Sequence, residues 1–464
     1  MSINIGNRRE PLWDYFLIDE EKTSATLSVN KLKELGSVFE FEEGNACVYP
    51  TIIHNGDKYL MYFGARDWPK YNPETGKLDE TKITVCMIES YDGINWTRPI
   101  VGKYGQNNIV NAHPTEARTC LSVFIDENPD CPPERKYKGL DRVDDGGKVF
   151  LESGTLACFA SSDGYNFERI EDVSREPGKF DSLNTVLYNK EEKQYRIYCR
   201  EFVDGNKRII CCRTSPDFIT WENLGAIKFD DDEFFQLYTN NIRQYSRAPH
   251  LYIGFPVRYV ERKQWTENYD QLPDRDVRLG RMHNKAYERL GLATTDSLFM
   301  CSRDGMNFKK FNESFLDPDM EAHGKWKYGN CYLSHGYTED ENNIYMYSIQ
   351  ENLAPNQPSK LIRYSIRKDG FASFKAPYSG AKIVTKPIIF DGNRLSVNFR
   401  TSVAGHIYVK IKDNAGNIAQ SIEIFGNNIN RTVAFDKPLS EFAGKEVIIE
   451  FDMVDAELYS FKFC

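Results

Sequence analysis

Carboxyl groups and arginines occur together at places where strand-like runs of the chain begin or end. Glu43 lies in F-E-E-G-N-A-C-V-Y-P, Asp181 lies in K-F-D-S-L-N, and Glu201 directly follows Arg200 in Y-R-I-Y-C-R-E. A neutral carboxyl group can donate a proton, whereas an ionised one can accept a proton or attack an electrophilic carbon. Burial and a nearby guanidinium move carboxyl pKa values in opposite directions, so such groups can divide these tasks. We therefore predict Glu43, Asp181 and Glu201 as catalytic groups.

Nearby stretches carry side chains suited to a polar, hydroxylated ligand. Aromatic faces pack against C–H groups, while amides and guanidinium groups hydrogen-bond to hydroxyls. The predicted ligand-binding residues are Asn45, Arg66, Arg200, Tyr238, Asn240, Arg247, His250, Arg258, Trp326, Asn330 and Glu351.

Each of these assignments competes with a structural alternative. Glu43 and Glu201 also suit a solvated rim, and Asp181 also suits a turn cap. His250, in Y-S-R-A-P-H-L-Y, can donate to a hydroxyl or activate water, but a lone histidine is more often a structural residue.

An internal repeat predicts how these residues are positioned. The turn S-Y-D-G-I-N-W recurs as S-S-D-G-Y-N-F, S-P-D-F-I-T-W and S-R-D-G-M-N-F, with a looser fifth copy, R-K-D-G-F-A-S-F. Three strand-like runs precede each turn and a closing strand follows it, so each unit of about 70 residues predicts a four-stranded blade. Five such units stacked radially form a five-bladed β-propeller.

The turn aspartates Asp92, Asp163, Asp217 and Asp304 are predicted to be structural, because aspartate in a tight turn hydrogen-bonds its own backbone. In an antiparallel blade the first strand starts, and the second ends, at the face opposite these turns. The three predicted catalytic residues occupy such positions, so we expect them to converge on an axial funnel.

The pattern changes after Pro377. Alternating runs such as L-S-V-N-F-R-T and V-I-I-E-F continue without the turn motif and predict a small antiparallel β-sandwich over residues 378–464. The propeller would then occupy residues 1–377, with residues 13–41 supplying outer strands or closing the ring. The predicted fold class is all-β.

Composition excludes several classes of function. The formal net charge of −9 offers no basic field for nucleic acid, and no apolar run approaches the length of a membrane span. The start lacks a signal-like segment, and the eleven cysteines, many in apolar runs, suit reduced core residues, so we expect a cytoplasmic protein. Neither a zinc-spaced cluster nor a phosphate loop occurs, so we predict no metal and no cofactor, although the sequence leaves open a structural ion in the central channel.

Stretches along almost the whole chain resemble a known family. They include W-D-Y-F-L-I-D, E-G-N-A-C-V-Y-P-T, K-F-D-S-L-N, Q-L-Y-T-N-N-I and A-E-L-Y-S-F-K-F. The chain resembles the five-bladed propeller glycoside hydrolases of the invertase, arabinanase and levansucrase type, in families 32 and 43, and most closely a bacterial branch with a C-terminal sandwich.

This resemblance implies a glycosidase acting on a short oligosaccharide or glycoside. By position, Glu43 resembles the first-blade base or nucleophile and Asp181 a supporting aspartate, while Glu201, Glu116 and Glu351 compete as the acid. The invertase strings N-D-P-N-G, R-D-P and E-C are absent, so the resemblance does not imply fructosidase activity.

Two further functions stay open. A glycoside phosphorylase would use one carboxylic acid and hold phosphate on Arg66, Arg200 and Arg258. A non-catalytic carbohydrate-binding or interaction propeller would need no carboxylate pair at all. A homo-oligomer is compatible with each function.

Overall fold

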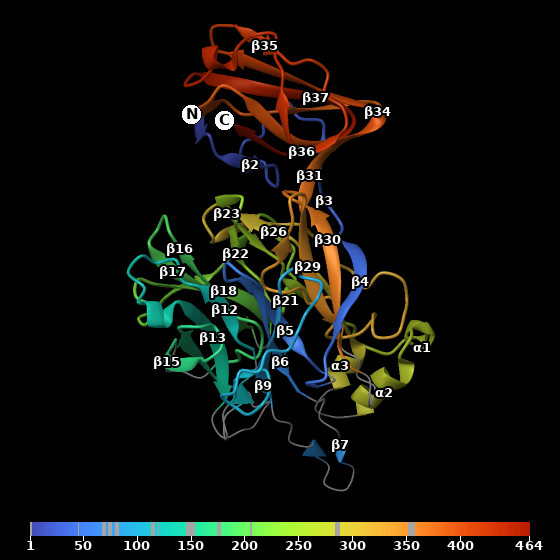
Figure 1. Ribbon diagram of the computed structural model, residues 1–464. Coiled ribbons are helices and arrows are strands. Elements are labelled where there is room, and N and C mark those ends of the chain that lie inside the picture. Colours follow the sequence, from blue (N-terminus) through green and yellow to red (C-terminus); the bar gives the residue numbers. More distant parts are fainter. Residues whose placement is uncertain are drawn as a thin grey trace.

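The computed structural model describes residues 2–464 except 45, 67–70, 73–76, 79–82, 113–116, 119, 145–153, 174–177, 205–206, 284–287 and 351–357. The chain is mostly β-structure. A large lower body carries a smaller upper unit that contains both chain ends (Figure 1).

The lower body is built from short, mainly antiparallel sheets. The first consists of β5 (Val48–His54), β6 (Tyr59–Ala65), β9 (Thr84–Ser90) and β10 (Ile109–Asn111). The second consists of β11 (Ala117–Arg118), β12 (Ser122–Ile125), β13 (Tyr137–Asp144), β14 (Thr155–Ser161) and β15 (Glu168–Asp172). The third consists of β16 (Thr185–Asn189), β17 (Gln194–Val203), β18 (Lys207–Ser215) and β19 (Glu222–Ala226).

The fourth unit is split into two sheets. One consists of β20 (Lys228–Phe229), β22 (Arg243–Tyr245), β23 (Ala248–Gly254), β26 (Met300–Ser302) and β27 (Asn307–Lys310). The other consists of β21 (Gln236–Leu237), β24 (Val257–Glu261) and β25 (Ala293–Ser297). Between β24 and β25 lie the helices α1 (Glu267–Gln271), α2 (Arg275–His283) and α3 (Glu288–Leu292).

The fifth sheet joins the two ends of this body. It consists of β28 (Thr338–Glu339), β29 (Asn343–Gln350), β30 (Lys360–Arg367) and, from near the start of the chain, β4 (Lys33–Glu40). Smaller elements are the pair β7 (Tyr71–Asn72) and β8 (Lys77–Leu78) and the 3-10 turns at Pro133–Arg135 and Leu439–Glu441.

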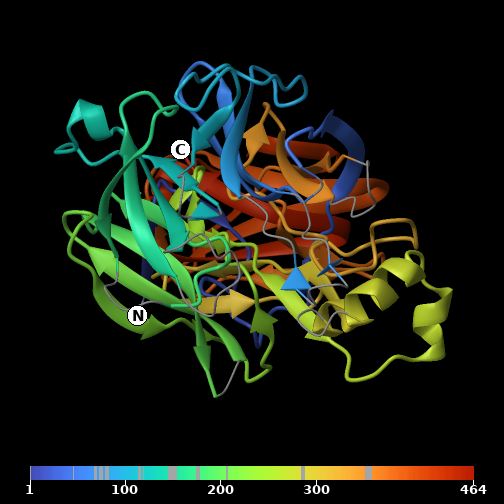
Figure 2. The same ribbon diagram turned by 90° about the horizontal axis from the view of Figure 1, so that it is seen from below.

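The five units follow one another in a closed cycle. Each of five buried apolar clusters combines side chains of two consecutive units, and the cluster of Phe63 and Ile349 joins the first unit to the fifth. Seen from below, the units run from blue through green and yellow to orange around the body (Figure 2). These sheets are consistent with the blades of a propeller.

The repeated turns connect neighbouring sheets. In the first, Asp92 accepts hydrogen bonds from the backbone N–H groups of Ile94 and Asn95, both at 2.8 Å, as predicted for a structural aspartate. Tyr347 of the fifth sheet donates its hydroxyl to the carbonyl oxygen of Gly93 at 2.7 Å. Gly93 has φ = +70°, and a Cβ there would lie 2.6 Å from the Tyr347 hydroxyl, so both the backbone and the neighbour require glycine.

The same contact recurs around the ring. Tyr62 donates to Gly164 at 2.8 Å, and Tyr198 donates to Gly305 at 2.9 Å. The third turn carries Phe218 at φ = +66° in place of glycine, with its ring packed against Tyr195. The turn motif therefore fixes sheets to each other as well as closing each one.

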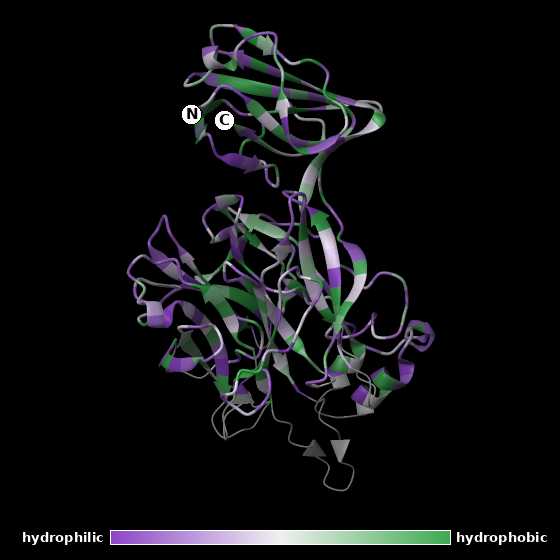
Figure 3. Cartoon of the chain, in the orientation of Figure 1, coloured by the Kyte–Doolittle hydropathy of each residue, from purple (hydrophilic) through white to green (hydrophobic). Residues whose placement is uncertain are grey.

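The upper unit is one ten-stranded sheet folded around its own core. It consists of β1 (Ile3–Gly6), β2 (Arg9–Pro11), β3 (Thr26–Val29), β31 (Ala372–Ala376), β32 (Ala381–Val384), β33 (Ile388–Phe390), β34 (Leu395–Asp413), β35 (Ile418–Gln420), β36 (Asn427–Val433) and β37 (Glu446–Phe463). Buried residues alternate with more exposed ones along much of β34 and β37. Both hydrophobic and hydrophilic stretches occur in the upper unit (Figure 3).

This pairing differs from the predicted limits of 1–377 and 378–464. Strands β1, β2, β3 and β31 lie in the upper sheet, although the sequence predicts residues 1–377 in the propeller. The 18-residue strand β37 is long enough to pair with several shorter partners, and β2 and β31 occupy part of its length. Covering such an edge protects it from pairing with another chain.

Candidate functional site

Asp181 precedes β16 at the lower face of the body, where the inner strands start. Its carboxylate forms an ion pair with Arg200 of β17. The Arg200 side chain is only 3% exposed, whereas that of Asp181 is 39% exposed. Asn184 fixes the loop, since it accepts a hydrogen bond from the Arg200 backbone and donates to the carbonyl oxygens of Phe180 and Ser182. Asp181 is therefore a solvent-accessible carboxylate that is paired with a buried arginine.

Tyrosines surround this ion pair. The Arg200 guanidinium lies 4.9 Å from the ring centre of Tyr238, and the Tyr328 hydroxyl donates to the Tyr238 hydroxyl at 2.8 Å. Tyr49, near the start of β5, lies with its hydroxyl 3.4 Å from the backbone oxygen of Asp181. Side chains from the first, third, fourth and fifth units thus meet here.

Tyr238 is more acidic than an ordinary tyrosine. Burial raises its pKa, but the charge of Arg200, the hydrogen bond with Tyr328 and the charge of Arg208 outweigh burial and lower the pKa to about 8. Burial raises the pKa values of Tyr49, Tyr328 and Tyr332 in the same cluster. Tyr238 is therefore the member of the cluster that loses its proton first.

Arg208 adds a second cation to the cluster. Its guanidinium lies 4.5 Å from the ring centre of Tyr259 and 5.4 Å from that of Tyr238. It donates to the amide oxygen of Gln236 at 2.7 Å, and no ion pair with a carboxylate is found for it among the described residues. The site therefore carries positive charge beyond what Asp181 balances.

Asp141 of β13 is a carboxylate that the sequence analysis missed. Its side chain is buried and accepts hydrogen bonds from Asn111 at 3.1 Å and from the Cys120 backbone at 3.0 Å. The Cys120 thiol contacts the carbonyl oxygen of Ser182 at 3.6 Å, beside Asp181. The available signal was its position in L-D-R-V-D, a second strand that ends at this same face.

Glu43 and Glu201 have partners of their own. Glu43 accepts hydrogen bonds from Arg98 at 2.8 Å and from Asn108 at 2.7 Å. Glu201 pairs with Arg213 at 2.8 Å. Within the described parts of the chain, neither carboxylate contacts Asp181, so the structure does not assemble the three predicted acids.

Several predicted ligand-binding residues make bonds that hold the fold. Arg258 forms two hydrogen bonds with Asp296, at 2.9 and 2.5 Å. The Asn240, Asn330 and Trp326 side chains donate to the backbone oxygens of Tyr198, Lys325 and Asp319. The Arg66 carbonyl accepts a hydrogen bond from the Ala46 backbone at 3.0 Å. Asn45, Glu116 and Glu351 lie outside the described residues.

Arg247 and His250 lie away from Asp181, at the junction with the upper sheet. Arg247 contacts Asp369 and Asn430, both at 3.4 Å, and His250 lies 3.5 Å from Glu10. Their predicted place among the ligand-binding residues needs correction, because strands from both ends of the chain cover the Y-S-R-A-P-H segment.

The described residues contain no group of three or more His, Cys, Asp or Glu side chains placed to hold a metal ion. None of the described helices is long and apolar enough to cross a membrane.

The chain matches no protein family model and no curated protein. Among solved structures, it is similar to an N-acetylgalactosamine deacetylase from F. plautii in complex with blood group B trisaccharide, with 10% identity, a TM-score of 0.48 and coverage of 74% of this chain and 96% of that one. It is also similar to a family 32 β-fructofuranosidase from Bombyx mori, with 10% identity, a TM-score of 0.45 and coverage of 94% and 95%.

A third similar structure is a family 117 glycoside hydrolase from the marine bacterium Zobellia galactanivorans, with 11% identity, a TM-score of 0.43 and coverage of 73% and 90%. Such low identities and TM-scores say nothing of this chain's chemistry, which must come from its own residues.

Proposed function

We propose that the five units form a five-bladed β-propeller and that its lower face hydrolyses a glycosidic bond in a short oligosaccharide or glycoside. The observation that carries this proposal is Asp181, a partly exposed carboxylate paired with the buried Arg200 beside Tyr238. A carboxylate with a buried countercharge and an aromatic wall suits a sugar whose anomeric carbon becomes positive in the transition state.

Glycoside hydrolysis needs a second carboxyl group. Glu43 and Glu201 pair with Arg98 and Arg213 and, in the part of the chain that the structure describes, do not contact Asp181. We assign this role to Asp141, whose carboxylate accepts hydrogen bonds from Asn111 and from the Cys120 backbone, because the contact of Cys120 with Ser182 links it to the Asp181 loop. Asp181 then faces the anomeric carbon, and the second carboxyl group exchanges a proton with the leaving oxygen or with water.

The test is hydrolysis of aryl and natural glycosides by the wild type, Asp181→Asn, Asp141→Asn and the control Asp172→Asn. Asp172 pairs with Arg169 on the outer strand β15 and is a carboxylate remote from the site. We expect Asp181→Asn and Asp141→Asn to lose about 100-fold or more in kcat, the usual contribution of an acid–base group. An Asp181→Asn enzyme as active as Asp172→Asn would overturn the proposal.

A glycoside phosphorylase is the second candidate, and Arg208 is the observation that favours it. Arg200 and Arg258 form ion pairs with Asp181 and Asp296. The Arg208 side chain instead donates a hydrogen bond to the neutral Gln236, and among the described residues no ion pair is found for it. Turnover that requires inorganic phosphate, with a KM for phosphate that rises in Arg208→Gln, would establish it. No turnover on any sugar, with sugar binding unchanged in Asp181→Asn, would indicate a carbohydrate-binding protein.

We also propose that the protein works in the reducing cytoplasm. All eleven cysteines are free thiols and most are buried, which supports this setting. Retention of the melting temperature under strong thiol reductant is the expected result.

A further inference from the structure

A second cavity lies at the opposite end of the inner strands from Asp181. Tyr49 near the start of β5 contacts the Asp181 loop, whereas His54 at its end lines the cavity. In the same way, Asn184, directly before β16, contacts the Asp181 loop, whereas Tyr188, near the end of β16, lines the cavity. A strand of this length separates the two places by roughly 20 Å. The cavity is therefore distinct from the Asp181 site.

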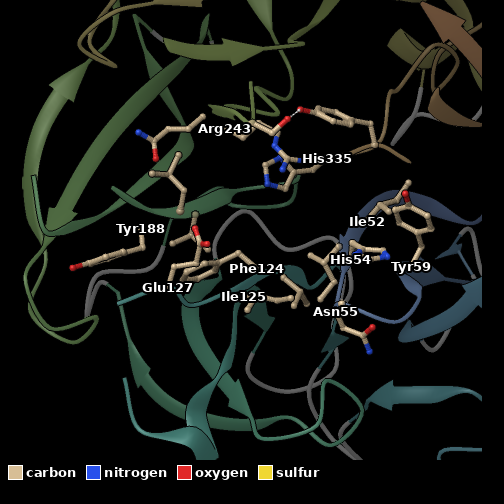
Figure 4. A pocket seen from close by; sticks show the side chains of 18 of the residues that line it. Ile52, His54, Asn55, Tyr59, Phe124, Ile125, Glu127, Tyr188, Arg243 and His335 are labelled. Atoms are coloured by element: carbon tan, nitrogen blue, oxygen red, sulfur yellow. Dashed lines mark hydrogen bonds between the residues drawn. The ribbon is translucent and has the colours of Figure 1, made fainter. Parts of the chain in front are cut away.

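We propose that this cavity, here called the Arg243 cavity, binds a small sugar-like ligand that carries a carboxylate or phosphate group. It has a volume of about 750 Å³, within the range of small-molecule sites. All five units contribute to its lining, as the side chains in Figure 4 show.

A buried histidine of the cavity lining has a ring nitrogen without a hydrogen-bond partner among the described residues. His335 is 5% exposed, and its Nδ1 atom has no hydrogen-bond partner among the described residues. Figure 4 shows its ring beside Arg243 at the cavity. Burial, and then the charge of Arg243, lower the pKa of His335 to about 3, so the ring is neutral at ordinary pH. A buried ring nitrogen without a partner indicates a bound group.

Charge at the cavity favours an anion. The Arg243 guanidinium lies 4.7 Å from the Tyr337 ring centre, and no ion pair is found for it among the described residues. In contrast, the lining carboxylates Glu127 and Glu339 pair with Lys190 at 2.9 Å and Lys368 at 3.5 Å. The third lining carboxylate, Asp340, accepts hydrogen bonds from the Tyr345 hydroxyl at 2.6 Å and from the backbone N–H groups of Asn342 and Asn343. An unpaired guanidinium is a strong binder of carboxylate and phosphate groups.

The remaining lining suits a hydroxylated ring. Aliphatic side chains and tyrosines stand together, and the Tyr337 hydroxyl is hydrogen-bonded to Ser246 at 3.1 Å. Flat aromatic surfaces with hydroxyl groups pack against the C–H faces of sugars and bond to their hydroxyls. The main apolar and aromatic lining residues are Ile52, Val123, Val186, Tyr59, Tyr188 and Tyr337.

The test is calorimetric titration with four probes: D-glucuronate, D-glucose 6-phosphate, inorganic phosphate and neutral D-glucose. We expect an anionic sugar to bind the wild type, and Arg243→Gln to weaken it by about tenfold or more, because a charge-assisted hydrogen bond is lost. The affinity of Arg243→Lys should lie between that of the wild type and that of Arg243→Gln. The preferred probe tells carboxylate from phosphate.

Two control variants place the binding. Asp181→Asn alters the lower face alone, and Arg275→Gln removes an exposed arginine of the α2 helix, so both should bind like the wild type. Three results would each overturn the Arg243 cavity as the site. The wild type does not bind either anionic sugar at a ligand concentration tenfold above about 1 mM, Arg243→Gln binds as tightly as the wild type, or Asp181→Asn loses binding. The proposed hydrolase activity is independent of all these outcomes.

Discussion

The junction between the two parts of the molecule and the lower face both contain carboxylates paired with arginine, but they use them differently. At the junction, Asp369 is fully buried and accepts hydrogen bonds from Tyr245 at 2.7 Å and from Ser460 at 2.6 Å, with Arg9 at 3.3 Å. At the lower face, Asp181 has one buried cation and remains partly exposed. A carboxylate whose oxygens are all occupied holds the fold, and one that keeps an open side is available to a ligand.

The largest predicted effect is on Asp369. Asp369→Asn leaves Arg9 and Arg247 without their shared countercharge in a buried place, which should lower the free energy of unfolding by about 3–5 kcal/mol. Urea unfolding measures the change, with Asp172→Asn, a partly exposed carboxylate, as the control. A loss below about 1 kcal/mol would contradict the contrast between junction and lower face.

The second effect is the acid sensitivity of Glu10. Burial raises its pKa, but His250, 3.5 Å away, and the charges of Arg303 and Arg8 lower it to about 2, below the ordinary 4.5. A lowered folded-state pKa stabilises the protein above pH 4.5, and this stabilisation, about 3 kcal/mol, is lost as pH falls from 4.5 towards 2. Unfolding measured across this range should show a loss that is about 3 kcal/mol smaller in Glu10→Gln than in the wild type, because other carboxylates with lowered pKa values, such as Asp163, still contribute.

A smaller effect is expected where the repeated turns join the sheets. Tyr198→Phe removes the hydroxyl that donates to Gly305 between the third and fourth units, and should cost about 1 kcal/mol. Tyr91→Phe, at an exposed position, is the matched control. Equal unfolding midpoints for the two variants would show that this contact does not fix one sheet to the next.

The smallest stability effect is expected at Asp181. Asp181→Asn should change the free energy of unfolding by less than about 1 kcal/mol, because the carboxylate is partly solvated. The buried Arg200 keeps its hydrogen bond to the Lys179 carbonyl oxygen at 2.7 Å and its contact with the Tyr238 ring. The same variant should have the largest effect on turnover. A destabilisation as large as that of Asp369→Asn would make Asp181 a structural residue.

Much of the blade pattern was predictable because it is local. The Ser-x-Asp-Gly turns close through hydrogen bonds between residues two or three positions apart, such as Ile94 and Asn95 to Asp92. The strands β1 and β2 were not predictable, since Arg9 meets Asp369 across 360 residues of chain. Pairing at such separations depends on the whole fold.

The candidate site divides in the same way. Arg200 and Glu201 are neighbours in sequence, but successive side chains of a strand point to opposite faces. Arg200 consequently meets Asp181 and Tyr238, while Glu201 meets Arg213. The strand pattern predicted that the Arg200 and Glu201 side chains point in opposite directions, but it did not predict which neighbours they contact.

The amino-acid sequence by itself determined the turns, the alternation of the strands and the supply of acids and arginines, because these depend on residues close together in the chain. Only the tertiary structure decided which carboxylates lie beside the Asp181 loop and which pair with an arginine elsewhere. Glu43 was removed from the set by Arg98, 55 residues away, and Asp141 was added by its approach to the Asp181 loop. Which partners a carboxylate meets depends on contacts that folding alone brings together.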